Sequence, residues 1–244
     1  MNTYHLIFRG INRQTIFEEP EDAYFFLRIL QSYQEKCGYE IWGYCLMGNH
    51  VHLLIKEGEE EWGVTMRRIG ARFVYWYNLK YDRSGHLFQG RFKSKAVEDV
   101  PYLLNVLRYI HQNPTAAGLV KEISQYKWSS YSEYMNKCKL VDRDFILDIF
   151  DKDREKALFK FIEFHQKKSE GDFLEAYERR RRTSDQEARA IIKSICPVTY
   201  CIDLQKIQKK DGRDQYLREL KQQGLSMRQI ARLTGISRGV ITKA

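Results

Sequence analysis

Residues 48–55 read GNHVHLLI, and this short segment constrains the fold more than any other part of the chain. Apolar and β-branched residues follow the Gly-Asn pair, which is typical of a buried β-strand. Because side chains alternate along a strand, His50 and His52 point to one face and Val51 to the other. Two neutral imidazoles side by side can bind a divalent cation. His-x-His also recurs by chance, in strands whose histidines bond to the backbone, so a metal site needs support from the rest of the chain.

The first 97 residues predict six elements in a fixed order. Alternating and aromatic residues indicate strands, whereas apolar residues at helical spacing indicate helices. The order is strand 4–9, helix 19–37, strand 39–47, strand 50–55, helix 62–81 and strand 93–97. This is the order of a ferredoxin-like α+β sandwich, with a Gly-Asn hairpin between the middle strands. It places His50 and His52 on a central strand, on a sheet face that the helices leave open.

A further helix is predicted over residues 99–113, ending at the proline that follows Asn113. Tyr109 and Asn113 are four residues apart, so a phenol and an amide would share one face of this helix. They would suit a nucleophile and a metal ligand, although Tyr109 is one of 16 tyrosines and amphipathic packing is the alternative. Tyr102 lies on nearly the same face, but Val106, four residues later, cannot ligate a cation. Tyr109 is therefore the preferred nucleophile.

The net charge of +9 is concentrated in the last quarter of the chain. Residues 177–244 carry 16 Lys and Arg against 7 Asp and Glu, whereas residues 1–135 are at +1 and residues 136–176 at −1. A concentrated basic segment is typical of a polyanion binder, and a solvated tail is the alternative. Arg179 and Arg180 begin a run of four arginines, which predicts either a phosphate-contacting patch or an exposed helix face.

Residues 225–244 have the pattern of a helix-turn-helix. Serines stand at both expected N-cap positions, and Gly235 suits the turn between the helices. The second helix of such a motif enters the DNA major groove, and Arg238 and Lys243 would lie on its reading edge. A plain helical hairpin is the alternative. With these patterns we expect an α+β domain over 1–135, a helical connector over 136–176 and an all-α region over 177–244.

Composition and segment lengths exclude several classes of protein. No apolar stretch approaches the ~20 residues that a membrane helix needs, and the first residues lack the features of a secretory signal. The five cysteines are scattered, with no Cys-x-x-Cys pair, which argues against a zinc ribbon or a disulfide framework. We therefore expect a cytoplasmic protein without a membrane partner.

Three segments together resemble the single-tyrosine HUH transposases, and within them most closely the REP-associated tyrosine transposases. They are NHVHLL at 49–54, FQGRF at 88–92 and RYIHQNP at 108–114. The resemblance covers about residues 3–135. It implies a metal-dependent endonuclease and strand transferase that acts on single-stranded, hairpin-forming DNA repeats as a monomer or homodimer.

The resemblance also implies roles for particular residues. His50 and His52 match the metal ligands, Tyr109 matches the nucleophile, and Asn113 stands where relatives often carry a glutamine ligand. Attack by Tyr109 would give a 5′-phosphotyrosine and a free 3′-hydroxyl. The ion would be Mg²⁺ or Mn²⁺, the latter suiting imidazole better, and no nucleotide cofactor is needed. Phe88 and Phe92 would stack unpaired bases. DNA contacts are expected from Arg13, Gln89, Arg91 and Lys93.

Two other functions remain open at this point. A replication initiator or relaxase uses the same chemistry, but such proteins tend to be longer or to have a helicase partner, and nothing here resembles a Walker loop. A non-catalytic regulator would bind DNA repeats through the helix-turn-helix. That regulator would need neither the histidine pair nor Tyr109.

Overall fold

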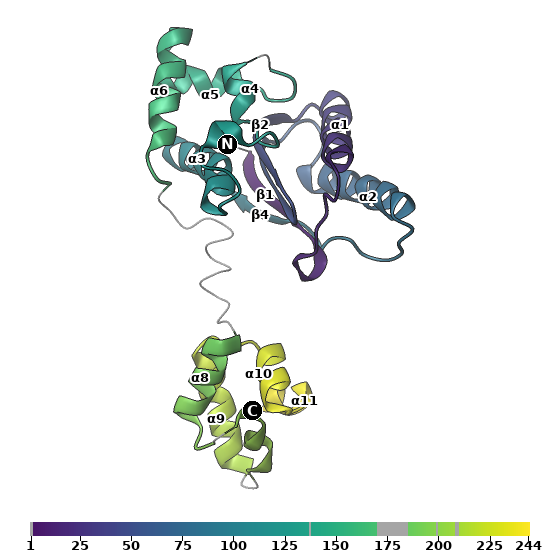
Figure 1. The fold of residues 1–244 in the computed structure, drawn as a ribbon, viewed down its shortest axis with the longest axis vertical. Coiled ribbons are helices and arrows are strands. Elements are labelled where there is room, and N and C mark those ends of the chain that lie inside the picture. Colours follow the sequence, from purple (N-terminus) through teal and green to yellow (C-terminus); the bar gives the residue numbers. More distant parts are fainter. Residues whose placement is uncertain (1, 137, 170–184, 199, 208–209) are drawn as a thin grey trace. The chain divides into compact units, whose positions relative to one another are not determined.

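The computed structural model describes residues 2–136, 138–169, 185–198, 200–207 and 210–244. The chain forms two compact units, residues 1–174 and 175–244 (Figure 1). The first unit therefore extends well beyond residue 135, where we expected the first domain to end. Arg179 and Arg180 lie outside the described residues.

A four-stranded antiparallel sheet in the order β2-β3-β1-β4 forms the centre of the first unit. Its strands are β1 (Thr3–Arg9), β2 (Glu40–Met47), β3 (His50–Lys56) and β4 (Lys93–Ala96). Helix α1 (Pro20–Cys37) connects β1 to β2, and helix α2 (Trp62–Lys80) connects β3 to β4. These elements follow the predicted ferredoxin-like order. Strand β3 is interior, since it pairs with both β1 and β2.

Helices cover both faces of this sheet. On one face the Phe8 ring of β1 meets the Phe26 ring of α1, with centroids 6.1 Å apart. On the other face α3 (Val100–Ala116) packs against β2. A Cβ on Gly43 of β2 would lie 2.5 Å from Cδ1 of Leu107, so this glycine lets α3 approach closely. The face that we expected to be open is thus covered, because the apolar stripe of α3 buries itself there.

The sequence predicted where helix α3 begins but not where it ends. Its start was predicted: the Asp99 side chain caps it by accepting from the Tyr102 N–H at 2.7 Å. Its end was predicted wrongly, because the helix continues through Pro114 to Ala116. Asn113 and Pro114 are both buried, and this packing outweighs the preference of a pre-proline residue for extended backbone.

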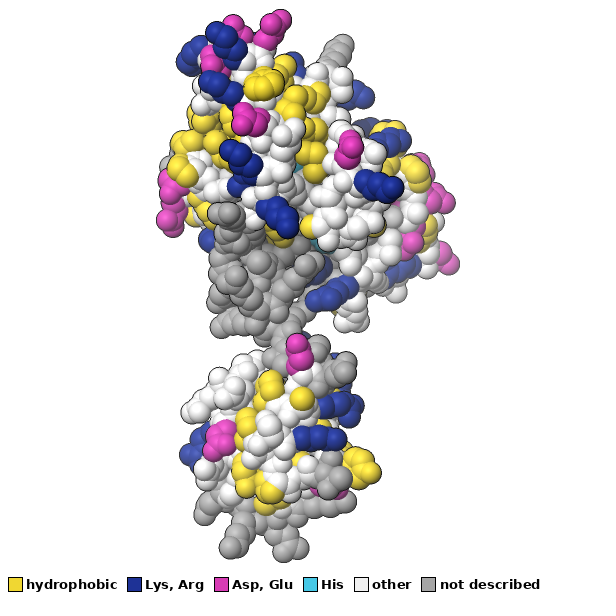
Figure 2. All heavy atoms as spheres, turned by 60° about the vertical axis from the view of Figure 1, so that its left-hand side comes forward, with side chains coloured by type: hydrophobic (Ala, Val, Ile, Leu, Met, Phe, Trp, Pro, Cys, Tyr) yellow, Lys and Arg dark blue, Asp and Glu magenta, His cyan; other side chains and the backbone are white. Residues whose placement is uncertain are grey.

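Three further helices enlarge the core of the first unit: α4 (Tyr131–Met135), α5 (Arg143–Phe150) and α6 (Arg154–Gln166). The Phe161 ring of α6 is fully buried and stacks on Tyr134 of α4, with centroids 4.5 Å apart. The segment expected to be a connector is thus packed into the first unit. Some hydrophobic residues of α5 and α6 remain exposed, and hydrophobic side chains gather on this side of the unit in Figure 2.

The described part of the second unit contains helices and no strand. They are α8 (Asp185–Ile195), η3 (Cys201–Lys206), α9 (Lys210–Gln222), α10 (Met227–Thr234) and α11 (Arg238–Lys243). The Ser226 hydroxyl caps α10 by accepting from the Gln229 N–H at 3.2 Å. Gly235 ends α10 with a φ of 75°, a left-handed conformation that favours glycine. The unit has its own buried core, separate from that of the first unit.

The five cysteines are thiols and not disulfide partners. Among the described residues, no helix combines the length and hydrophobicity that crossing a lipid bilayer requires.

Candidate active site

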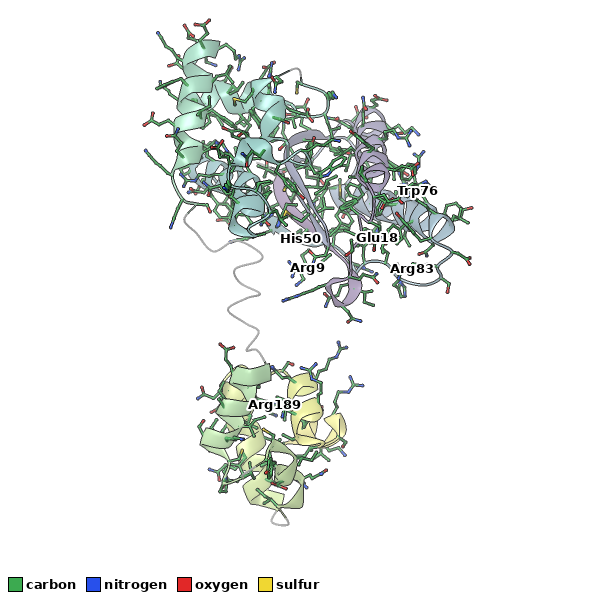
Figure 3. All side chains as sticks on the ribbon, viewed as in Figure 1. Arg9, Glu18, His50, Trp76, Arg83 and Arg189 are labelled. Carbon is green, nitrogen blue, oxygen red and sulfur yellow. The ribbon has the colours of Figure 1, made fainter. Side chains whose placement is uncertain are left out.

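The register of β1 and β3 gathers polar residues on one face of the sheet. His52 lies opposite Ile7 and His50 lies opposite Arg9. Because paired and alternate residues share a face, His5 and Arg9 point to the same side as the two histidines of β3. We call this side the histidine face. Arg9 and His50 lie at one end of the sheet (Figure 3).

The tautomer of His50 follows from its hydrogen bonds. The Asn49 amide donates from Nδ2 to the Arg13 carbonyl at 3.2 Å. Its Oδ1 therefore faces His50 Nδ1, which lies 2.6 Å away. An amide oxygen only accepts, so His50 Nδ1 carries the proton and Nε2 carries the lone pair. A lone pair on Nε2 is what metal ligation by this histidine requires.

His52 is held from both sides. Its Nδ1 lies 3.0 Å from Nε2 of His5, and its Nε2 lies 3.3 Å from Nδ2 of Asn113. With the amide as donor, His52 Nε2 carries a lone pair and Nδ1 donates its proton to His5. His5 and His52 are 0% exposed and His50 is 9% exposed. The His50 and His52 rings are nearly perpendicular, with centroids 4.9 Å apart.

Helix α3 places Tyr109 and Asn113 over this histidine pair. The half-buried Tyr109 ring stands at 86° to His52, with centroids 5.5 Å apart. It also lies 6.1 Å from the His5 ring. Tyr102, the other tyrosine considered, instead has the Lys95 ammonium 4.7 Å from its ring centroid. The structure thus brings together the four residues that the sequence singled out, His50, His52, Tyr109 and Asn113.

The donor set is unlike that of a zinc site. In the described part of the chain, no group of three His, Cys, Asp or Glu side chains is arranged so that it could hold a metal ion. Two imidazoles and one amide remain as a candidate set. Ligands at right angles on an ion with bonds of about 2.1 Å lie about 3 Å apart, close to the 3.3 Å between the His52 and Asn113 nitrogens. These residues therefore fit Mg²⁺ or Mn²⁺ once the amide turns its oxygen inward.

A second set of contacts fixes α3 to α6. The Arg108 guanidinium lies 4.2 Å from the Phe164 ring centroid and donates to the Phe164 carbonyl at 3.2 Å. His111 Nδ1 lies 2.9 Å from His165 Nε2, and Gln112 donates to the His165 carbonyl at 2.9 Å. These residues are sequence neighbours of Tyr109 and Asn113 on α3. Helix α6 therefore holds the helix that carries the candidate nucleophile.

The residues of the first unit that we expected to contact DNA lie in the turn after β1, on β4 and in the segment that precedes β4. The Gln89 N–H donates to the Arg9 carbonyl at 2.7 Å, which joins the segment around Gln89 to the turn containing Arg13. Arg13 and Arg91 are exposed. Lys93 is exposed on β4 opposite Ile7, which places it on the histidine face.

Other expected DNA contacts have different surroundings. Phe88 and Phe92 pack against the Phe8 ring, with centroids 5.3 and 5.5 Å away, so these rings belong largely to the core. The expectation that they stack bases is therefore not supported. In the second unit, Arg238 and Lys243 are exposed on α11.

The sequence reasoning missed His5 and Arg9. Alternation within residues 3–9 places His5, Ile7 and Arg9 on one face, and that signal was available. Whether this is also the face of His50 and His52 depends on the register between β1 and β3. His5 and His52, which meet across that register, are 47 residues apart in the sequence. Local spacing does not determine that register.

Comparison with known proteins links the first unit to one family. Residues 2–113 match the family model "Transposase IS200 like". A curated Haemophilus influenzae protein, whose name places it among the REP-associated tyrosine transposases, is 25% identical over 115 residues. That alignment covers 41% of this chain, and this chain spans only 65% of the length of that relative.

Two solved structures are also similar. One is a REP-associated tyrosine transposase bound to a REP hairpin, with 22% identity, a TM-score of 0.49, and coverage of 56% of this chain and 80% of that one. The other is described as a transposase from Deinococcus radiodurans, with 19% identity, a TM-score of 0.30, and coverage of 49% and 88%. This chain is thus similar to the REP-associated tyrosine transposases, and the match to the family model lies within the first unit.

Proposed function

We propose, from the similarity of residues 2–113 to IS200-like transposases, that the protein is a metal-dependent single-stranded DNA endonuclease and strand transferase. Its substrate is DNA that forms hairpins. The observation that carries this proposal is that Tyr109 and Asn113 both contact His52. Packing alone does not require a phenol, an amide and an imidazole to meet at one point.

The chemistry suits the groups present. Tyr109 Oη attacks a backbone phosphorus, an O–P bond to the tyrosine forms, and the bond from phosphorus to the 3′-oxygen breaks. The phenol gives up its proton and the leaving 3′-oxygen gains one, which yields a 5′-phosphotyrosine and a 3′-hydroxyl. Attack by a different 3′-hydroxyl reverses the step and joins two strands.

A phenol is a weak nucleophile at neutral pH because its pKa is near 10. A Mg²⁺ or Mn²⁺ ion held by His50, His52 and Asn113 would act as a Lewis acid that offsets charge on the scissile phosphate. The protein's own contribution is to hold the three ligands and Tyr109 at fixed positions before DNA binds.

His5 is a positioning residue in this proposal. A histidine that binds a metal through Nε2 usually donates its Nδ1 proton to an acceptor, which fixes the ring and raises its basicity. The acceptor for His52 is Nε2 of His5, 3.0 Å away and fully buried. His5 thus occupies the place that a carboxylate or carbonyl often takes beside a metal-bound histidine.

Helix α6 has a positioning role as well. A misplacement of about 1 Å can cost about 100-fold in rate, because proximity effects depend on near-attack geometry. The contacts of Arg108, His111 and Gln112 with α6 fix the rotation of α3 about its axis. This rotation determines whether Tyr109 faces the histidines.

The DNA path is proposed to follow basic residues. Lys93 on the histidine face and the exposed Arg13 and Arg91 suit the phosphate contacts that fix the register of a strand. Helices α10 and α11 are proposed to act as a helix-turn-helix, with Arg238 and Lys243 toward DNA. Five cysteine thiols suit a reducing compartment, so the cytoplasm is the proposed location.

One experiment tests the central claim. The protein is incubated with single-stranded oligonucleotides that contain a hairpin flanked by randomised sequence, with Mn²⁺ or with EDTA. We expect a protein–DNA adduct that survives denaturing electrophoresis in Mn²⁺ and is absent in EDTA. Tight hairpin binding without any adduct from the whole library would contradict the enzyme proposal and favour a non-catalytic repeat-binding regulator.

A further inference from the structure

A second concave site lies at the outer edge of β2. It is a cavity of about 690 Å³ between α1 and the segment 127–140. Tyr44 of β2 lines it, whereas the next residue, Cys45, pairs with His52. Because neighbouring residues of a strand point to opposite faces, the cavity opens on the side of the sheet away from the histidine face. It is therefore distinct from the candidate active site.

Two aromatic rings form one wall of this cavity. The Tyr24 and Trp128 rings lie nearly edge to face, with centroids 4.9 Å apart. Tyr24 is 49% exposed, so part of its ring is accessible to a ligand. The Lys127 ammonium lies 4.8 Å from the Trp128 centroid and 5.0 Å from the Tyr24 centroid. The Lys127 ammonium thus lies close to both rings of this wall.

The rim of the cavity carries an excess of positive charge. Arg28, Lys127 and Lys139 line it and are exposed. Within the described part of the chain, none of these three residues forms a salt bridge. Three cations around one aromatic wall attract an anionic ligand.

The only acidic residue among those lining the cavity is already satisfied. Glu133 Oε1 accepts from the Tyr44 hydroxyl at 2.7 Å. Its Oε2 accepts from the N–H groups of Lys139 and Leu140 at 2.7 and 2.8 Å. This carboxylate therefore holds the 138–141 loop in place and is not available to pair with the cations of the rim.

The walls are attached to the sheet. The Trp128 carbonyl accepts from the Leu46 N–H at 2.9 Å, and the Tyr126 hydroxyl donates to the Leu46 carbonyl at 2.8 Å. Together with the Glu133 anchor, these bonds build the cavity into the fold, as is usual for ligand sites. A preformed site costs less ordering entropy on binding than one assembled by the ligand.

We propose that this cavity binds a single-stranded DNA segment that flanks the hairpin. One unpaired base stacks on Tyr24 or Trp128, and the adjacent phosphates contact Arg28, Lys127 and Lys139. An aromatic wall beside basic residues is the arrangement that binds unpaired bases without sequence preference. A duplex does not suit this wall, because its bases are stacked inside the double helix and their faces cannot stack on Tyr24 or Trp128. This inference rests on the proposed function, since it assumes a DNA substrate.

The test compares two DNA probes on the full-length protein. One is a blunt hairpin and the other is the same hairpin with single-stranded oligo-dT tails, both labelled for fluorescence anisotropy in EDTA. We expect the tails to strengthen binding by the wild type. Tyr24→Ala should weaken binding of the tailed probe about tenfold, the size of one base–aromatic stack, and leave the blunt probe unchanged.

Matched variants control for indirect effects. Tyr75→Ala removes a tyrosine that is 69% exposed on α2, and it should change neither probe. Lys127→Ala should lower the salt dependence for the tailed probe by about 0.7 in log–log slope, the value for one single-strand phosphate contact. Lys156→Ala, an exposed lysine of α6, should not.

The two proposals fail in different ways. Equal effects of Tyr24→Ala and Tyr75→Ala on the tailed probe, or equal wild-type affinity for both probes, would overturn the cavity proposal and leave the enzyme proposal standing. Absence of binding to either hairpin would overturn both. Quenching of fluorescence by oligo-dT that disappears in Trp128→Phe would support a base in the cavity.

Discussion

His165 Nε2 on α6 lies 2.9 Å from His111 Nδ1 on α3, in the interior of the first unit. His165 Nδ1 lies 2.9 Å from the Phe161 carbonyl, which only accepts, so Nδ1 carries the proton. His111 must then donate from Nδ1 to His165. When His111 is neutral, its Nε2 accepts from the Ser130 hydroxyl at 2.7 Å, and this hydroxyl then does not donate to the Tyr44 carbonyl 3.1 Å away. Burial lowers the pKa of His165 to about 3 and the pKa of His111 well below its usual value. Burial thus favours the neutral form of both rings, and the bonds to Phe161 and Ser130 can be made with both rings neutral.

The first prediction concerns stability and pH. Both histidines have pKa values near 6.5 when unfolded, so below that pH the unfolded chain binds two protons that the folded unit excludes. Stability is full above pH 6.5 and falls as the pH drops from there toward about 3, the pKa of folded His165. Between pH 6.5 and 5.5 the loss for the pair is about 2 kcal/mol in the free energy of unfolding.

Urea unfolding followed by tryptophan fluorescence measures this loss. All four tryptophans, at positions 42, 62, 76 and 128, belong to the first unit, so the signal reports on that unit alone. His165→Gln removes one titrating group and should reduce the pH dependence of stability by about half of the pair's contribution. An unchanged pH dependence in this variant would show that His165 is not the group that titrates.

The second prediction concerns the nucleophile. Tyr109→Phe keeps the ring that contacts His52 but removes the hydroxyl. We expect no covalent DNA adduct from this variant and nearly unchanged affinity for hairpin DNA. Tyr102→Phe is the matched control and should form the adduct normally. An adduct from Tyr109→Phe would assign the chemistry to another residue.

The third prediction concerns His5. His5→Phe removes the acceptor for the His52 Nδ1 proton, and the loss of such a partner typically lowers metal affinity about 10- to 100-fold. Electron paramagnetic resonance of free Mn²⁺ during a titration measures this affinity without DNA or turnover. His86→Phe, at an exposed histidine, should bind Mn²⁺ as the wild type does. His5→Gln, whose amide oxygen can accept the proton, should recover part of the loss, and equal losses in both His5 variants would speak against the acceptor role.

The fourth prediction concerns the basic region. Removal of residues 177–244, which carry a net charge of +9, should weaken DNA binding and flatten its salt dependence, because fewer counterions are released. Arg238→Ala with Lys243→Ala in the full chain should lower the log–log salt slope by up to about 1.8 on duplex DNA. Affinity that is the same with and without residues 177–244 would make this region a protein-interaction module.

Local spacing along the chain was enough to predict how the four candidate site residues are arranged on their own elements. Period-two alternation placed His50 and His52 on one face of β3, and a separation of four residues placed Tyr109 and Asn113 on one face of α3. The order of strands and helices gave the antiparallel sheet with β3 inside. These features follow from the regular backbone geometry of strands and helices. That geometry repeats within a few residues, so a local sequence pattern is enough to indicate it.

The neighbours of these residues depend instead on how distant segments pack. The β1–β3 register brought His5 to His52 across 47 residues, and the burial of Phe161 brought His165 to His111 across 54. Packing also carried α3 past Pro114, covered the face expected to be open and turned Phe88 and Phe92 toward the core. Each outcome is the result of apolar surfaces from distant segments burying one another, and no local pattern specifies which surfaces meet.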